Sequence, residues 1–270
     1  MNDRDFLTML EKRQSEGSNV CVGLDVDYWN EQFIPDSRTP ELAVTEHAFA
    51  VIMQTRTIAA AYKLNWAFYL QLGDDGIRIL RSIVDFVRLY ADCVPIILDG
   101  KFGDIGNTGK AYARTAFEIV KADAVTVNPY MGVADVTAPF LAYPGKFCYV
   151  LVKTSNPGSG ELQGLSVGYT LARMFFFEEV ARNAKRLGSD RLGAVVGATF
   201  PSELKLLRDN YPDMQFLVPG LGAQGGSPEA IALAGPNTIF NSSRGIVFAD
   251  DPYNAAAELH NLISGSLYSQ

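Results

Sequence analysis

The sequence predicts an α/β fold, a (β/α)8 TIM barrel formed by a single domain with an extra amino-terminal helix. Eight apolar, strand-like runs alternate with about as many helical patterns over 270 residues, which matches the repeat and the usual length of this barrel. The runs are rich in Val, Ile and Leu without strict alternation, as in parallel strands buried on both faces. No linker rich in Pro, Ser or charge divides the chain, so residues 1–270 are expected to form one domain.

Each expected strand is an apolar run that ends in polar or charged residues. In chain order the runs are VCVGLDVD (20–27), AAYKLNWAFY (60–69), VPIILDGK (94–101), DAVTVNPY (123–130), FCYVLVKTS (147–155), LGAVVGAT (192–199), QFLVPGLG (215–222) and TIFNSSRG (238–245). Helical patterns cover residues 3–14, 43–60, 74–91, 107–120, 133–141, 167–187, 202–211, 227–234 and 254–264. The competing fold is a doubly wound open sheet, which the lack of Gly-x-Gly-x-x-Gly after the first strand disfavours only slightly.

The overall charge and hydropathy limit the classes of partner. The net charge of −7 supplies no positive field for nucleic acid or an anionic membrane, so neither is expected as a partner. No run of about 18 apolar residues is present, and the amino terminus lacks the apolar core of a signal peptide. We therefore expect a cytoplasmic protein. A local anion site needs only a few amides and one Arg, so the net charge does not exclude one.

Charged side chains gather where the first three expected strands end. The first strand is expected to end in Asp25, with Asp27 just beyond. Lys63 lies within the second run, and Asp99 and Lys101 end the third, with Asp104 in the following loop. Active sites of this barrel lie at the carboxyl ends of the strands, and the amino ends hold no comparable cluster. Asp99 and Lys101 are two residues apart and so share a face.

These charges predict a catalytic array of alternating lysines and aspartates. Lys63, Asp99, Lys101 and Asp104 are expected to form it, each charge having an opposite neighbour. One such contact contributes about 4 kcal/mol before desolvation at roughly 4 Å and an effective dielectric constant near 20. The alternative is a static network of ion pairs. His47 and His260 fall in expected helices away from the strand ends, so acid–base work is expected of Lys and Asp, and a His-based metal site is not expected.

A second pattern predicts a phosphate site after the seventh and eighth strands. The segment GLGAQGG (220–226) precedes an expected helix that starts at Ser227 and Pro228, and Arg244 follows the eighth strand. Glycines expose backbone amides, a guanidinium suits phosphate, and this barrel often binds phosphate at these loops. The alternative interpretation is a pair of ordinary turns.

Taken together, the motifs resemble those of the orotidine 5′-phosphate decarboxylase family. The segment LDGKFGDIGNT (98–108) is similar to the family's Asp-x-Lys-x-x-Asp-Ile-x-x-Thr signature. The segments VGLDVD, YKLNWAFY, KTSNPGSGELQ, VPGLGAQGG and SSRGIVFA follow in the family's order, so the resemblance covers roughly residues 18 to 250. The fifth-strand and Gly-rich segments resemble the bacterial branch with a short phosphate loop.

This resemblance implies a decarboxylation of orotidine monophosphate to uridine monophosphate that needs neither cofactor nor metal. It makes Lys101 the proton donor to C6 of the pyrimidine and puts Asp99 beside the substrate carboxylate. Lys63 and Asp25 would bind the ribose hydroxyls, Ser155 the pyrimidine, and Gln224 and Arg244 the phosphate. Asp104 and Thr108 would reach into the site of a second subunit, which implies a homodimer with shared sites. Ile105, Asn156 and Gly222 complete the expected substrate-binding set.

Two other functions stay open at this stage. Sugar-phosphate decarboxylases and aldolases of the same superfamily share the Asp-x-Lys-x-x-Asp pattern but bind Mg²⁺; the TSNPG segment argues against them. A phosphate-binding barrel without enzymatic activity would not need alternating lysines and aspartates.

The segment 156–164 is expected to act as a mobile lid.

Overall fold

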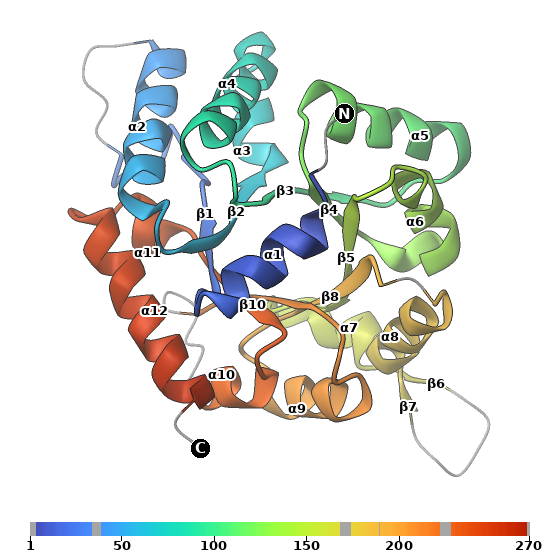
Figure 1. The fold of residues 1–270 in the computed structure, drawn as a ribbon. Helices are drawn as coiled ribbons and strands as arrows, with labels where there is room; N and C mark the ends of the chain where they lie inside the picture. Colours follow the sequence, from blue (N-terminus) through green and yellow to red (C-terminus); the bar gives the residue numbers. More distant parts are fainter. Residues whose placement is uncertain (1–3, 34–38, 168–173, 189, 222–227, 269–270) are drawn as a thin grey trace.

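The fold is a closed barrel of eight parallel strands, seen in the computed structural model of residues 4–33, 39–167, 174–188, 190–221 and 228–268 (Figure 1). The barrel strands run in the order β1-β10-β9-β8-β5-β4-β3-β2. Their bounds are β1 Val20–Gly23, β2 Ala59–Asn65, β3 Ile96–Phe102, β4 Ala124–Val127, β5 Phe147–Lys153, β8 Leu192–Val196, β9 Phe216–Pro219 and β10 Thr238–Ser242. Because β1 pairs with β10, the sheet has no edge, and the predicted barrel, not the open sheet, is confirmed.

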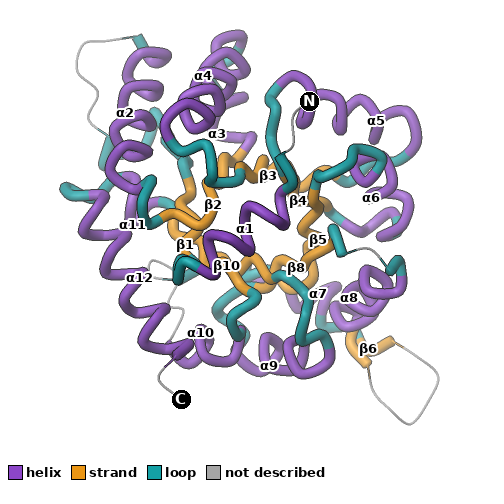
Figure 2. Tube along the Cα trace, in the orientation of Figure 1, coloured by secondary structure: helices purple, strands orange, loops and turns teal. Residues whose placement is uncertain are grey.

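Helices surround the barrel, as Figure 2 shows from one end. The α-helices are α1 Phe6–Ser15, α2 Pro40–Thr55, α3 Trp66–Leu70, α4 Asp74–Tyr90, α5 Gly106–Arg114, α6 Val133–Leu141, α7 Gly160–Gln163, α8 Phe176–Arg186, α9 Pro201–Asn210, α10 Pro228–Ala234, α11 Arg244–Val247 and α12 Pro252–Tyr268. Short irregular helices are η1 Thr115–Ile119, η2 Pro129–Met131 and η3 Pro157–Ser159. None of the helices in the described part of the chain is long and apolar enough to cross a membrane.

The predicted amino-terminal helix is present and covers the amino ends of the strands. Asp5 caps α1 by accepting a hydrogen bond from the amide of Thr8. Phe6 and Leu10 are fully buried, and the Phe6 ring lies 4.9 Å from that of Phe147 on β5. In Figure 2, α1 lies across the middle of the ring of strands. The barrel is therefore closed by apolar packing at this end, and its cavity opens at the other.

Most differences from the expected elements are shifts at their ends, and two are larger. The second strand ends at Asn65, and residues 66–69 belong to α3 because the Asn65 side chain accepts a hydrogen bond from the Ala67 amide and caps that helix. The helix expected over 167–187 is wrong in its first part. A short antiparallel pair, β6 Ser166–Val167 and β7 Met174–Phe175, comes first, and α8 begins at Phe176. The Glu178 carboxylate, which accepts from the Phe175 amide, fixes that start.

The amino ends of the strands hold an ionic cluster, contrary to the sequence prediction. Asp123, which directly precedes β4, is fully buried, and its carboxylate lies 2.8 Å from Arg4, 3.3 Å from Lys146 and 3.6 Å from Arg88. We call these four residues the amino-end cluster. Its cations come from the amino terminus, α4 and the turn before β5, which are far apart in the sequence, so no local pattern reveals them.

Candidate active site

A cavity of about 790 Å³ lies at the carboxyl ends of the strands. Strands β1, β2 and β3 line it with charged side chains: Asp25, which follows β1, Lys63 on β2, and Asp99 and Lys101 on β3. The other wall is apolar and includes Leu151, Val195 and Leu217 from β5, β8 and β9. The cavity therefore offers a charged face and an apolar face to a ligand that is itself partly charged and partly aromatic or apolar.

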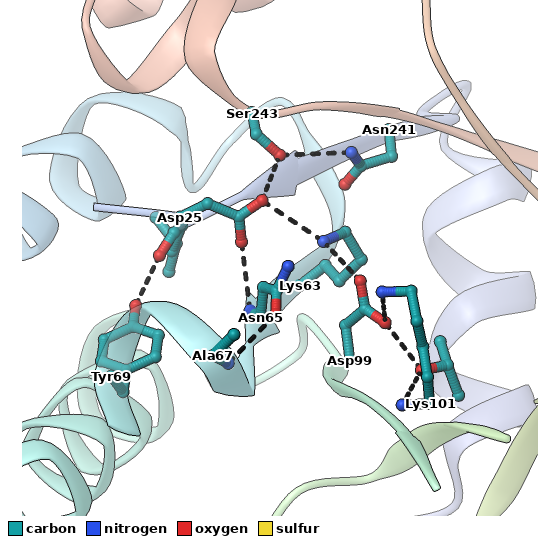
Figure 3. A network of polar contacts seen from close by, with 11 residues as sticks. Asp25, Lys63, Asn65, Ala67, Tyr69, Asp99, Lys101, Asn241 and Ser243 are labelled. Atoms are coloured by element: carbon teal, nitrogen blue, oxygen red, sulfur yellow. Dashed lines mark hydrogen bonds and ion pairs between the residues drawn. The ribbon is translucent and has the colours of Figure 1, made fainter. Parts of the chain in front are cut away.

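The four charged side chains form a continuous chain of ion pairs, which we call the carboxyl-end cluster (Figure 3). The Lys63 ammonium lies 3.5 Å from Asp25 Oδ2 and 3.1 Å from Asp99 Oδ2. The Lys101 ammonium lies 2.8 Å from Asp99 Oδ1. Lys63 and Asp99 are nearly inaccessible to solvent, whereas the Lys101 side chain is 49% exposed. Lys101 is thus the member of the cluster that a ligand in the cavity can reach most directly.

The surroundings favour the charged forms of both buried members. Burial by itself would lower the pKa of Lys63, but the Asp25 and Asp99 carboxylates outweigh it and hold that pKa above its ordinary value. Burial would likewise raise the pKa of Asp99, but Lys63, Lys101 and a hydrogen bond from Thr126 hold it well below its usual range. Asp99 is therefore a fixed negative charge, and Lys63 a fixed positive charge, at neutral pH.

Asp25 is held in place by neighbours from three elements. The Ser243 hydroxyl, after β10, donates to Asp25 Oδ2 at 2.7 Å, and the Asn65 amide donates to Oδ1 at 3.1 Å. The Tyr69 hydroxyl of α3 donates to the carbonyl of Leu24 beside it. These contacts fix the carboxylate that pairs with Lys63 from the side opposite Asp99.

Lys101 takes its position from a bulge in β3. Leu98 pairs with Val125 and Phe102 with Val127, so three residues of β3 stand opposite one residue of β4. Lys101 has a φ of +46°, a conformation that side chains other than glycine rarely adopt. The predicted contact between Asp99 and Lys101 is present, but this bulge produces it and not the regular alternation of a strand.

Asp104 is not part of the ionic chain within one subunit, contrary to the predicted array. Its Oδ1 accepts from the Ile105 amide at 2.8 Å, and no ion pair joins it to another described residue. Asp25 takes the expected place of a second carboxylate. Asp104 and Lys101 line a second, open hollow of about 350 Å³ beside the cavity. Ile105 and Thr108, on the adjoining start of α5, are exposed and line neither hollow.

Of the remaining predicted residues, Ser155, Asn156 and Arg244 line the main cavity. Gly222 and Gln224 lie outside the described residues.

In the predicted lid segment, the side chain of Gln163 on α7 accepts from the Thr154 amide at 2.9 Å and donates to the Thr154 hydroxyl at 2.8 Å. This segment is therefore tied to the end of β5 in the present conformation.

Sequence reasoning missed three kinds of residue at the site. The apolar wall is hidden in strands that look uniformly apolar. Ser243 stands within the quoted SSRG segment, but its contact with Asp25 depends on the closure of β10 on β1. Thr126 carries the one hydroxyl in the AVTV run of β4, and a lone polar residue in an apolar strand is the sequence signal that could have identified it.

In the described part of the chain, no three His, Cys, Asp or Glu side chains group as they would around a metal ion.

Comparison with known proteins agrees with the motifs. The model of the orotidine 5′-phosphate decarboxylase / HUMPS family matches residues 18–259. The chain belongs to this family. It is 41% identical to the orotidine 5′-phosphate decarboxylase of Thermomicrobium roseum, over 86% of this chain and 83% of that protein. It is 40% identical to that of Azoarcus sp., over 93% of each.

Solved structures of family members share the whole barrel. The OMP decarboxylase of Leishmania donovani is 37% identical with a TM-score of 0.85, covering 97% of this chain and 98% of that one. The UMP synthase of Leishmania donovani is 38% identical with a TM-score of 0.87. That match covers 98% of this chain but 57% of the synthase, so this chain corresponds to only part of that longer protein.

Proposed function

We propose that this protein decarboxylates orotidine 5′-phosphate to uridine 5′-phosphate without a cofactor. The observation that carries the proposal is the half-exposed ammonium of Lys101, 2.8 Å from the buried Asp99 carboxylate at the edge of a large cavity. Membership of the family and relatives of about 40% identity named orotidine 5′-phosphate decarboxylase support the same reaction. They do not favour a Mg²⁺-dependent sugar-phosphate enzyme or a barrel that only binds phosphate.

In this reaction the bond between C6 and the carboxylate carbon breaks, and its electron pair stays on C6. CO₂ leaves, and the Lys101 ammonium donates a proton to C6. No ring carbonyl readily delocalises the charge at C6, so the site must stabilise it electrostatically. An ammonium that Asp99 already holds in place costs little reorganisation when the charge develops. The ionised Asp99 also faces the substrate carboxylate, whose charge is lost as CO₂ departs.

The other side chains bind and orient the nucleotide. Lys63 and Asp25, which contact each other, are assigned to the ribose hydroxyls. Ser155 and Asn156, at the cavity wall, are assigned to the pyrimidine, and Arg244 to the phosphate. Gly222 and Gln224 are assigned to the phosphate on sequence alone. Binding energy from the phosphate, far from C6, can position the ring for reaction.

We further propose that each site is completed by a second copy of the chain. Asp104, Ile105 and Thr108 lie on one exposed segment beside Lys101, and Asp104 lacks a cation partner among the described residues. In a symmetric homodimer this segment would face the partner's site.

Mixed dimers test this proposal. Lys101→Ala and Asp104→Asn variants should each be poorly active, yet mixed dimers of the two should contain one intact site. Random mixing should then restore roughly a quarter of wild-type activity. A mixture as inactive as its components would contradict shared sites.

The proposed reaction is tested by following the loss of orotidylate absorbance with purified protein, with and without EDTA. Turnover that persists in EDTA is expected. Turnover that EDTA abolishes would point to the Mg²⁺-dependent alternative, and tight binding of nucleotide without CO₂ release would point to the binding protein.

Since both substrate and product are charged nucleotides, we propose that the protein works in the cytoplasm, which cell fractionation tests.

A further inference from the structure

Thr126, on β4, connects the two central groups of the site through a single hydroxyl. Its Oγ1 donates to Asp99 Oδ1 at 2.7 Å and accepts from the backbone amide of Lys101 at 2.9 Å. The residue is 1% exposed, so neither contact competes with bulk water. So far it has entered only as one of the groups that lower the pKa of Asp99.

The position of Thr126 in the sheet explains why one residue makes both contacts. It is the single residue of β4 opposite the three bulged residues of β3, since its neighbours Val125 and Val127 pair with Leu98 and Phe102. A bulge leaves ladder groups without their usual partners. The Thr126 hydroxyl takes the place of a backbone acceptor for the Lys101 amide, at the residue with a φ of +46°.

The same hydroxyl helps to determine which donors each of the two Asp99 carboxylate oxygens contacts. Oδ1 accepts from both Thr126 and the Lys101 ammonium, whereas Oδ2 faces Lys63. Without the hydroxyl, Oδ1 loses one of its two donors, and the carboxylate can rotate about its last bond. The Lys101 amide would also lose its acceptor, so both ends of the Lys101 residue would be less constrained.

We propose that Thr126 is a positioning residue that sets the direction of the Lys101 ammonium, by pinning the bulge and the Asp99 carboxylate together. This inference rests on the proposed role of Lys101 as the proton donor. Thr126 acts on that step through its two neighbours and has no role in binding the ribose or the phosphate. Its loss should therefore lower kcat and leave KM nearly unchanged.

The test compares three variants with the wild type in the orotidylate assay. Thr126→Val keeps the shape of the side chain and removes the hydroxyl, and a misplacement of about 1 Å should cost on the order of 10²-fold in kcat. Thr126→Ser restores the hydroxyl and should recover kcat to within a few-fold of the wild type. Thr137→Val is the matched control, because Thr137 is equally buried but its hydroxyl contacts the carbonyls of Val133 and Ala134 in its own helix, α6. It should leave kcat unchanged.

The outcomes separate this inference from the proposed function. A wild-type protein without turnover would overturn the proposed function and, with it, the inference. An active wild type with an equally active Thr126→Val would overturn the inference alone. Equal losses in the Val and Ser variants, or a KM that rises as much as kcat falls, would also overturn it. If the Val variant does not fold, Thr126→Cys takes its place and is compared with Thr126→Ser, because the thiol is a much weaker hydrogen-bonding group than the hydroxyl on an otherwise identical side chain.

Discussion

The two ends of the barrel each hold an ionic cluster around a buried aspartate, and the two clusters differ in how cations and anions are arranged. At the carboxyl end, Asp25, Lys63, Asp99 and Lys101 alternate in sign, and the last of them reaches the cavity. At the amino end, the single carboxylate of Asp123 is surrounded by Arg4, Arg88 and Lys146. The first arrangement leaves a charged group available to a ligand. The second uses its charges to join segments of the chain.

The lysines of the two clusters show the effect of this difference. Two carboxylates hold the pKa of Lys63 above its ordinary value although the residue is buried. Burial lowers the pKa of Lys146, and the neighbouring Arg88 and Arg4 lower it further, so that Asp123 does not make up for them. The charged form of a buried lysine is thus stabilised only when opposite charges around it outweigh like charges and the cost of burial; one ion pair is not enough.

The largest expected effect is a loss of activity when the carboxyl-end cluster is changed. Lys101→Ala should lower kcat by more than about 10³-fold, because a general acid contributes up to roughly 10⁴-fold. Stability should change little, since the side chain is half-exposed. Steady-state kinetics and thermal melting of the same preparation measure both. Near-normal kcat would remove Lys101 from the mechanism.

The counterpart at the amino end is Asp123→Asn. Removing the fully buried carboxylate that pairs with these three half-buried cations should lower the free energy of unfolding by about 3 to 5 kcal/mol. Urea denaturation measures this, and kcat of the folded protein at low temperature should stay at the wild-type value. A normal stability would show that the cations are satisfied by the backbone carbonyls that they also contact.

A smaller effect is expected when one of the surplus cations is removed. Lys146→Met keeps the aliphatic stem, removes the ammonium, which lies 5.5 Å from the centre of the Phe117 ring, and leaves Arg4 and Arg88 with Asp123. The free energy of unfolding should change by less than about 1 kcal/mol, in contrast to Asp123→Asn. Denaturation of both variants under one set of conditions gives the comparison. A loss as large as that of Asp123→Asn would mean that the three cations act as one unit.

The smallest effect is the pH dependence of the carboxyl-end cluster in the neutral range. Because the pKa of Asp99 is lowered by folding, its contribution to stability is complete above the unfolded value near 4 and declines as the pH falls below it. Because the pKa of Lys63 is raised, its contribution is complete below the unfolded value near 10.4 and declines as the pH rises through the folded pKa.

The stability difference between the wild type and Asp99→Asn should therefore be flat from about pH 5 to 9 and shrink under about pH 4. Urea titrations at a series of pH values measure it. A difference that varies between pH 6 and 8 would contradict the assigned charges.

Much of the barrel follows from local patterns, and much of the site does not. The apolar runs predict the eight strands because each is buried on both faces, and the strand ends then place Asp25, Lys63, Asp99 and Lys101 at one edge. The bulge opposite Thr126 could not be predicted, since it depends on the register between β3 and β4. The amino-end cluster was missed because Arg4 and Asp123 are brought together only by the closed fold.

The aromatic-rich segment 66–69 and the segment before α8 show a related limit. The run WAFY has strand-forming side chains, yet a single capping contact from Asn65 turns it into a helix. The start of α8 is likewise decided by Glu178 and not by the periodicity that precedes it.

The packing of Phe6 and Leu10 closes the amino end of the barrel, so in the described part of the chain the cavity opens toward the carboxyl ends of the strands. Incoming nucleotide and outgoing nucleotide must then use the same passage and take turns, so exchange at the site is strictly sequential. Uridine 5′-phosphate should act as a competitive inhibitor because it occupies the same site, and anything that obstructs this opening should slow both substrate binding and product release.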